Sequence, residues 1–301
     1  MKPTLHPEVE QALARGAPVV ALESTLLAHG IPPGRRAEAA TRIEAAVRKH
    51  GAVPATIAII GGVPHVGLDD AARARVIAGH ARKASLRDLA IALAGTDDWA
   101  TTVSTTMALA ARVGISVFAT GGIGGVHREV LETWDESADL GALAKHPVAV
   151  VCAGAKAVLD LPRTLERLET LGVPVLGYRC AELPAFYHAH SGLMLEHRVE
   201  SAEHIARILR VRFQTLREGG VLIVQPPPAG FAQDAAAVDV LIAKALEEAN
   251  RAGVRGAKIT PFLLARLDRL SEGSVVDTNL ALVEQNAALA ADIAVELSKP
   301  A

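Results

Sequence analysis

Two ionisable side chains stand directly beyond strand-like apolar runs, the position at which α/β proteins gather catalytic groups. Lys156 lies just after the run 148–152 and shortly before Pro162, which marks a helix start, and Glu23 directly follows the run 19–22. A lysine amine can form a covalent imine with a sugar aldehyde. A glutamate in this position can act as a general acid or base, or simply cap a helix. The position of Lys156 therefore predicts covalent chemistry on a carbonyl group.

A group of carboxylates downstream is suited to a hard metal ion. Asp135 and Asp139 stand four residues apart, with Glu136 between them. Mg²⁺ and Mn²⁺ prefer oxygen ligands and need only one or two protein carboxylates, because bound waters complete the coordination. The alternative is that these residues form the acidic first turn of a helix.

Two segments are candidates for binding a phosphate group. Residues 119–128 contain four glycines, which let backbone N–H groups approach an anion, although a tight turn would need the same glycines. The segment is no dinucleotide fingerprint, because His127 stands where the third glycine would be, and it lacks the Gly-Lys-Ser/Thr of a P-loop. Lys83 lies in a basic, serine-bearing stretch that suits a phosphate or an ordinary solvated surface.

The cysteines and histidines predict neither a disulfide nor a zinc site. Cys152 and Cys180 lie far apart in apolar or strand-like contexts, typical of buried thiols in a reducing cytosol. Four further residues have the right side chains for zinc but lack a standard ligand spacing, so a surface loop explains them better: His188, His190, Glu196 and His197.

The alternation of apolar runs and helical stretches predicts an α/β fold that positions these groups. Six runs of strand length indicate buried, mostly parallel strands: 19–22, 56–60, 116–119, 148–151, 173–176 and 220–224. Helical stretches at 36–50 and 165–171 each end before a glycine. Two Ala-rich amphipathic stretches, 235–252 and 279–297, are expected to cover the sheet or make a subunit contact. Since no linker or repeat marks a boundary, we expect a single domain over 1–301.

Composition restricts the class of ligand. Half of the 301 residues are apolar, only 3% are aromatic, and the net charge is −2 with basic residues dispersed. The chain therefore lacks the basic patch and aromatic platform that bind nucleic acid, and it lacks a footprint for anionic membranes. No signal-peptide core or membrane-length apolar run is present. We expect a soluble cytoplasmic protein that binds a small molecule.

A string of short motifs runs through the chain in order: LEST (22–25), GAVPATIA (51–58), IGGV (60–63), TTVS (101–104), FATGGIGGVHR (118–128), SADL (137–140), VCAGAK (151–156), LPAF (183–186) and TPFLLAR (260–266). Together with Asn279 they resemble the pseudouridine-5'-phosphate glycosidase family over about residues 22 to 297. An ordered string of this length is far more specific than one short pattern.

This resemblance implies an α/β/α layered fold with a mostly parallel central sheet. It also implies a metal-dependent homotrimer, with Mn²⁺ or Mg²⁺ as cofactor. The implied reaction is the reversible cleavage of the carbon–carbon glycosidic bond of pseudouridine 5'-phosphate, which gives uracil and ribose 5-phosphate.

The resemblance also assigns roles to individual residues. Lys156 would be the nucleophile, Glu23 the proton donor and Asp135 the metal ligand. Contacts with the substrate would come from a further set: Lys83, Val103, His127, Ser137, Ala138, Asp139 and Asn279. One departure lies beside Lys83, where the family usually reads KVSRRDL and this chain reads KASLRDL (83–89), so Leu86 replaces an arginine.

The bond to be broken explains why a lysine would be needed. A C-glycoside has no heteroatom leaving group, so the two-carboxylate mechanism of common glycosidases does not apply. We expect Glu23 to help open the ribose ring and neutral Lys156 to attack C1′, forming an iminium as the C–C bond breaks. Only about one ordinary lysine in a few thousand is neutral at pH 7. An apolar strand or a nearby cation must therefore favour the neutral amine.

Two other functions are consistent with parts of this pattern. A Schiff-base aldolase or lyase on another phosphosugar would share the lysine and the phosphate site but would need no pocket for a pyrimidine. A non-catalytic sugar-phosphate sensor would be expected to lose the nucleophile or the acid, and this chain keeps both.

Overall fold

A computed structural model of the protein describes residues 2–254, 259–271 and 273–300. Within these residues eleven strands form one sheet, whose main row has the order β1-β4-β3-β2-β7-β8-β11-β9-β10, while β6 pairs with β3 and β5 with β6. Among the described strands, only β3–β4 and β3–β6 pair antiparallel. The strands are β1 (Thr4–Leu5), β2 (Val19–Glu23), β3 (Val53–Ile60), β4 (Val63–Val66), β5 (Arg82–Ala84), β6 (Trp99–Thr101), β7 (Val117–Ala119), β8 (Ala149–Cys152), β9 (Val175–Tyr178), β10 (His197–Val199) and β11 (Val221–Val224).

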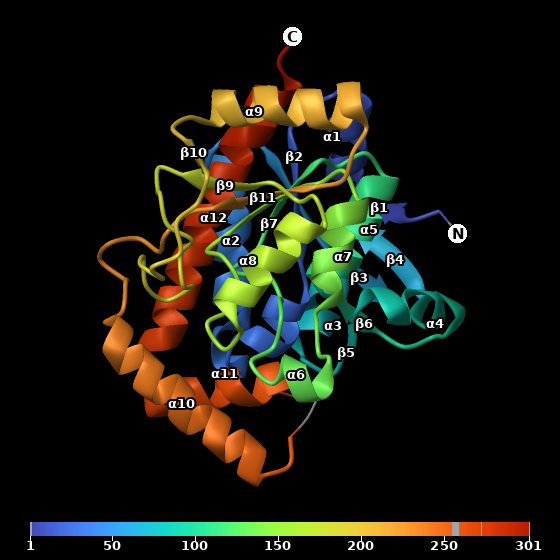
Figure 1. Cartoon of the computed structure of the whole chain (residues 1–301). Helices are drawn as coiled ribbons and strands as arrows, with labels where there is room; N and C mark the ends of the chain where they lie inside the picture. The colour runs from blue at the N-terminus through green and yellow to red at the C-terminus, as the bar shows by residue number, and fades with distance from the viewer. Residues whose placement is uncertain (1, 255–258, 272, 301) are drawn as a thin grey trace.

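Helices cover both faces of this sheet. On one face α12 contacts β2, β7 and β8 and packs beside α2 and α9, and on the other α5 contacts β2 and β3 and packs beside α7, which contacts α8. Figure 1 shows the two groups on either side of the strands. The helices are α1 (Pro7–Ala14), α2 (Arg36–Lys49), α3 (Asp70–Ile77), α4 (Leu89–Ala94), α5 (Val103–Arg112), α6 (Val130–Thr133), α7 (Ala138–Lys145), α8 (Leu161–Thr170), α9 (Ala202–Arg210), α10 (Ala235–Arg251), α11 (Ile259–Leu270) and α12 (Ser274–Ser298). This arrangement confirms the expected α/β/α fold.

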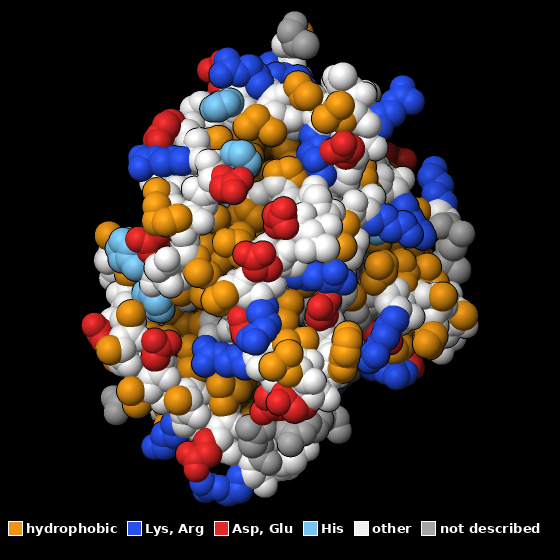
Figure 2. Space-filling model, in the orientation of Figure 1, with side chains coloured by type: hydrophobic (Ala, Val, Ile, Leu, Met, Phe, Trp, Pro, Cys, Tyr) orange, Lys and Arg blue, Asp and Glu red, His pale blue; other side chains and the backbone are white. Residues whose placement is uncertain are grey.

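The remaining short helical segments lie between these elements. Two are single 3₁₀ turns and two are π-helical: η1 (Leu26–Gly30, π), η2 (Pro33–Arg35, 3₁₀), η3 (Leu86–Asp88, 3₁₀) and η4 (Val211–Leu216, π). No helix in the described part of the chain is long and apolar enough to cross a bilayer. On the face drawn in Figure 2, acidic and basic side chains are interspersed.

All six predicted strands belong to this sheet, and they form its middle as β2, β3, β7, β8, β9 and β11. Their side chains point into helical layers on both faces, so the strands are apolar throughout rather than alternating. The strands that the sequence did not indicate are β1, β4, β5, β6 and β10. Each has only two to four residues, and most include an exposed or half-buried polar side chain, so they leave no recognisable pattern.

The predicted helices form, with shifted ends. The helix α8 begins at Leu161, earlier than the apolar period indicates, because Asp160 accepts a hydrogen bond from the backbone N–H of Arg163 at 2.9 Å. Pro162 fits the first turn because that turn needs no N–H from it. The helix ends before Gly172, whose φ of 66° favours glycine.

Strand register places the first functional groups side by side. Leu22 of β2 pairs with Ala119 of β7, and Ala119 pairs with Val151 of β8. Because the three strands are parallel, their carboxyl ends meet at one edge of the sheet. Glu23 and Thr120, each the next residue along the chain, therefore emerge there as neighbours.

Candidate active site

A pocket with a cavity volume of about 340 Å³ opens at the carboxyl ends of β2, β7 and β8. Every residue that the motifs assign to the site lines it: Glu23, Lys83, Val103, His127, Asp135, Ser137, Ala138, Asp139, Lys156 and Asn279. These residues come from nearly the whole length of the chain. The structure thus brings the complete set together, while the role of each stays a prediction.

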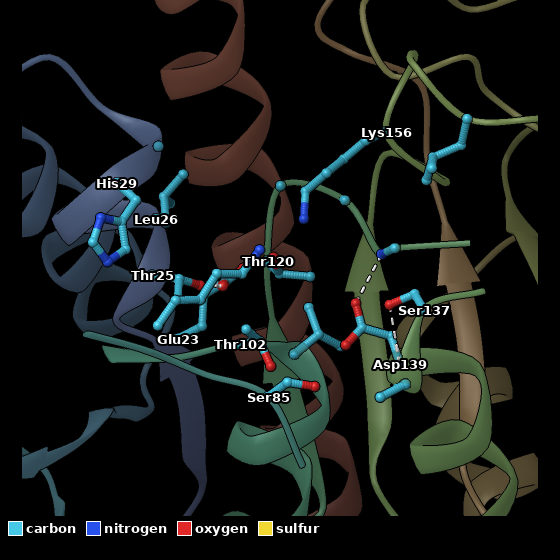
Figure 3. Close-up of a pocket in the computed structure, with 18 of the residues that line it drawn as sticks. Glu23, Thr25, Leu26, His29, Ser85, Thr102, Thr120, Ser137, Asp139 and Lys156 are labelled. Atoms are coloured by element: carbon cyan, nitrogen blue, oxygen red, sulfur yellow. Dashed lines mark hydrogen bonds between the residues drawn. The ribbon is translucent and has the colours of Figure 1, made fainter. Parts of the chain in front are cut away.

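Lys156 reaches the pocket from the loop between β8 and α8. Its backbone N–H donates to the carbonyl of Ile123 at 3.0 Å, and Ala155 bridges to Ile123 in parallel. The loop therefore runs alongside the glycine-rich segment that follows β7. Figure 3 shows the amine of Lys156 pointing into the pocket between Glu23 and Asp139.

Glu23 is the last residue of β2, and its side chain is only 7% exposed. Its carboxylate accepts hydrogen bonds from two hydroxyls, with Thr25 at Oε2 and Thr120 at Oε1. The helix-capping alternative is therefore wrong, because the carboxylate bonds to side chains and not to the N–H groups of a helix. Its position suits proton transfer to a ligand in the pocket.

Lys83 extends from the short strand β5 into the same pocket. Burial lowers the pKa of this amine, and the charge of Lys156 lowers it further, against the opposite effect of Asp139 and Glu23. Two amines thus share one pocket, and the charge of Lys156 disfavours the protonation of Lys83. The surface-lysine alternative for Lys83 does not hold, since its amine is largely desolvated.

Asp139 is a buried structural carboxylate that connects three elements. Its Oδ1 accepts from the backbone N–H of Ser104 at 2.9 Å, and its Oδ2 accepts from Gly124 at 2.8 Å. Its own N–H donates to Ser137, the N-cap of α7, at 3.2 Å. The helix-start explanation therefore holds for Asp139, and α5, α7 and the glycine-rich segment are joined at its carboxylate.

The glycine-rich segment does not form a phosphate cradle with most of its amides. Within this segment the backbone N–H groups of four residues already donate to protein acceptors: Ile123, Gly124, Val126 and His127. The glycines instead permit close packing. A Cβ at Gly124 would lie 2.3 Å from Oγ of Ser137, and one at Gly122 would lie 2.6 Å from the ring of Phe186.

Asp135 is the carboxylate that could hold a metal ion. It lines the pocket and lies with Oδ2 3.9 Å from Nε2 of His127. Among the residues that the structure describes, no group of three or more His, Cys, Asp or Glu side chains could hold a metal. The donor set therefore fits Mg²⁺ or Mn²⁺ only as an ion that keeps most of its waters, which is common for these cations.

Asn279 enters the pocket from α12 and is 4% exposed. Its Oδ1 has no hydrogen-bond partner among the described residues. Because buried amide oxygens are nearly always paired, an ordered water or a ligand atom is the expected partner. Gly121 allows this approach, since a Cβ there would come within 3.1 Å of the amide oxygen.

Several lining residues carried no assigned role from the sequence, among them Thr25, His29, Thr102, Thr120 and Phe186. His29 lies in the π-helical turn η1 directly after β2. Burial lowers its pKa, a hydrogen bond to the backbone of Ala81 opposes this, and the charges of Lys83 and Arg36 lower it further. A π-helical turn leaves no periodic pattern in the sequence. Only the closeness of His29 to Glu23 along the chain could have indicated it.

The thiol of Cys152 is buried, whereas that of Cys180 is only half-buried. Burial raises the pKa of Cys152 to about 12 and that of Cys180 to about 11, so both thiols are poor nucleophiles at neutral pH. Nδ1 of His190 lies 3.5 Å from Oε1 of Glu182. Within the described residues no zinc-type cluster includes the histidines of this region.

Comparison with known proteins agrees with this geometry. Residues 8–296 match the family model described as Indigoidine synthase A like protein. Two relatives named pseudouridine-5'-phosphate glycosidase are each 51% identical: one from Herpetosiphon aurantiacus, over 97% of both chains, and one from Sorangium cellulosum, over 98% of this chain and 94% of the other.

Solved structures give the same result. The prealnumycin C-glycosynthase AlnA, in complex with ribulose 5-phosphate, is 40% identical with a TM-score of 0.90 over 99% of this chain and 98% of the other. An indigoidine synthase A-like protein of Thermotoga maritima is 32% identical, also with a TM-score of 0.90, over 99% and 97%. Fold, pocket and full-length similarity together establish that this chain belongs to the Indigoidine synthase A like family, in which the motifs had indicated the pseudouridine-5'-phosphate glycosidases.

Proposed function

We propose that the protein is a pseudouridine-5'-phosphate glycosidase that reversibly cleaves the C–C glycosidic bond of its substrate to uracil and ribose 5-phosphate. The observation that carries this proposal is the convergence of an amine and a carboxylate, Lys156 and Glu23, on one pocket that also holds a second amine, Lys83. The names of the similar proteins support it, and one of them is a C-glycosynthase bound to a sugar phosphate.

The chemistry follows from the groups in the pocket. Glu23 gives a proton to the ring oxygen O4′ as the C1′–O4′ bond breaks, and the lone pair of Lys156 Nζ forms a bond to C1′. The ammonium so formed returns a proton to the Glu23 carboxylate, and Glu23 passes this proton to uracil C5. The C1′–C5 bond then breaks, its electron pair leaves with the uracil, and the freed lone pair of nitrogen forms the C=N bond of an iminium. Water then hydrolyses the iminium and releases ribose 5-phosphate and the free amine.

Other lining groups would bind and orient the substrate. The half-buried Lys83 provides positive charge for a phosphate or for a developing anion. The unpaired amide oxygen of Asn279 can accept a hydrogen bond from a sugar hydroxyl or from an N–H of uracil. Val103, His127, Ser137 and Ala138 complete the walls of the pocket.

A hard cation, Mn²⁺ or Mg²⁺, is proposed as the cofactor, held by Asp135 largely through waters. Such an ion supplies Lewis-acid stabilisation of substrate oxygens when it is bound. The support is the donor type and the position of the carboxylate at the pocket wall. Asp139 is not proposed as a ligand, because both of its oxygens accept backbone hydrogen bonds.

The assembly proposed for this enzyme is a homotrimer. Two large apolar side chains stand close to Asp135 in the sequence. They are Leu131 and Trp134, which are 74% and 86% exposed in the single chain. A subunit contact near the pocket would cover them. Light scattering of the purified protein measures the mass directly, and a monomer at micromolar concentration would contradict the proposal.

The decisive experiment runs the reaction in the synthetic direction. Uracil and ribose 5-phosphate should give pseudouridine 5'-phosphate with the wild type and with Lys145→Ala, an exposed lysine of α7, but not with Lys156→Ala. Borohydride added with ribose 5-phosphate should leave a reduced sugar adduct on Lys156 by peptide mass spectrometry. Turnover of a ribose phosphate without any need for uracil would instead favour an aldolase or lyase. Normal turnover by Lys156→Ala would reject the imine mechanism.

A further inference from the structure

We infer that Thr25 is a positioning residue whose hydroxyl lets Glu23 pass between its ionised and protonated forms without moving. The inference rests on the proposed role of Glu23 as proton donor. In this role the carboxylate must give up a proton and take it back within a buried site, where an unpaired polar atom is costly in either form.

The two hydroxyls that bind Glu23 differ in their other contacts. Thr120 donates to Oε1, and among the described residues its hydroxyl has no second hydrogen-bond partner. Its backbone is held on both sides, since its N–H donates to Val151 at 3.0 Å and its carbonyl accepts from the side-chain amide of Asn286 at 2.9 Å. Thr120 therefore acts as a fixed donor that keeps Oε1 in place.

Thr25 has a choice of acceptors. Its Oγ1 contacts Oε2 of Glu23 and also lies 3.1 Å from the carbonyl oxygen of Thr101. A hydroxyl carries one hydrogen and can accept as well as donate. When Glu23 is ionised, Thr25 donates to Oε2. When Oε2 carries the proton, it donates to Oγ1 of Thr25, and the hydrogen of Thr25 turns to Thr101.

The second acceptor is held firmly. The backbone N–H of Thr101 donates to Oγ of Ser24 at 2.8 Å, and the Thr101 hydroxyl donates to the carbonyl of Ile57 at 2.6 Å. Ser24 and Thr101 are both fully buried. The carbonyl of Thr101 therefore stays within reach of Thr25 in both states, and only a hydrogen has to rotate.

This difference assigns the mobile proton to one oxygen. A proton on Oε1 would face Thr120, whose hydroxyl hydrogen would lose its acceptor among the described residues. A proton on Oε2 faces Thr25, which can redirect its hydrogen to Thr101. Oε2 is thus the atom from which Glu23 delivers its proton and to which the proton returns.

The test replaces the hydroxyl while keeping the shape. Thr25→Ser keeps the hydroxyl and should hold kcat within about threefold of wild type, whereas Thr25→Val should lower kcat by about 10- to 100-fold with KM within about threefold. The limb of the kcat–pH profile that reports the acid should move to higher pH in Thr25→Val, because the ionised carboxylate has lost a donor. Thr41→Val, an exposed threonine of α2, serves as the control.

A folded Thr25→Val with wild-type kcat and pH profile, or a Thr25→Ser as impaired as Thr25→Val, overturns the inference while the wild type's activity preserves the proposed function. A wild type with no activity on uracil and ribose 5-phosphate overturns both. If circular dichroism shows that Thr25→Val does not fold, Thr25→Ala is measured in its place against the same expectations.

Discussion

Lys83 and Lys156 approach one pocket from β5 and from the loop after β8, and the charge of Lys156 adds to burial in lowering the pKa of Lys83. Two like charges in a desolvated site cost folding free energy. The chain keeps both, which is the usual sign that a site is organised for binding or catalysis and not for stability.

Replacing Lys83 should therefore separate stability from function. At pH 7, Lys83→Met should raise the free energy of unfolding by about 1 kcal/mol and raise KM for ribose 5-phosphate at least about tenfold. The lowered pKa means that the unfolded chain binds more protons between that pKa and the usual lysine value, so wild-type stability gains as pH rises through this range. The difference in the free energy of unfolding between Lys83→Met and the wild type should therefore shrink as pH rises. Urea unfolding at several pH values measures it, with Lys145→Met as control.

Asn279 and Asn286 lie on the same helix, α12, and offer a matched pair of buried amides. Asn279 has an unpaired Oδ1, whereas Asn286 donates to Thr120 and accepts from Gln225 at 3.0 Å. Asn279→Leu should leave stability within about 1 kcal/mol of wild type and raise KM, while Asn286→Leu should lose about 1–3 kcal/mol. Equal losses of stability in the two variants would show that Asn279 is a structural amide.

Gly124 and Gly141 test the close packing around Asp139. A Cβ at Gly124 would lie 2.3 Å from Ser137 and 2.9 Å from the Asp139 carboxylate, whereas one at Gly141, in α7, meets nothing within 4 Å. Gly124→Ala should lose about 1–3 kcal/mol of stability and most of the activity. Gly141→Ala should gain about 0.5–1 kcal/mol, because glycine disfavours a helix interior. Thermal unfolding and synthetic turnover measure both.

Removal of divalent cations should abolish turnover, and Mn²⁺ or Mg²⁺ should restore it. Asp135→Asn should need a higher concentration of metal for half of its maximal rate, because an amide binds a hard cation less well than a carboxylate. Glu132→Gln, on the neighbouring exposed helix α6, should behave like the wild type. Full activity in the presence of a chelator would rule out the metal.

The middle of the fold could be predicted because its strands are apolar throughout. Runs such as 148–151 and 220–224 became β8 and β11 with ends shifted by at most one residue. The short strands β5 and β6 could not be predicted, since Arg82–Ala84 and Trp99–Thr101 are too brief to show a period. They are strands because β3 pairs with β6 and β6 with β5, which depends on the tertiary fold.

By itself, the sequence determined the family and predicted a set of residues that the fold brings to one pocket, because ordered motifs carry both even when they lie far apart in the chain. The tertiary structure decided how those residues are used. Asp139 binds backbone amides of two remote segments. Glu23 is held between the hydroxyls of Thr25 and Thr120, and these two residues are in turn bonded to Thr101 of β6 and Asn286 of α12. Hydrogen bonds between distant segments depend on ångström-scale positions, and residue types in order do not contain that information.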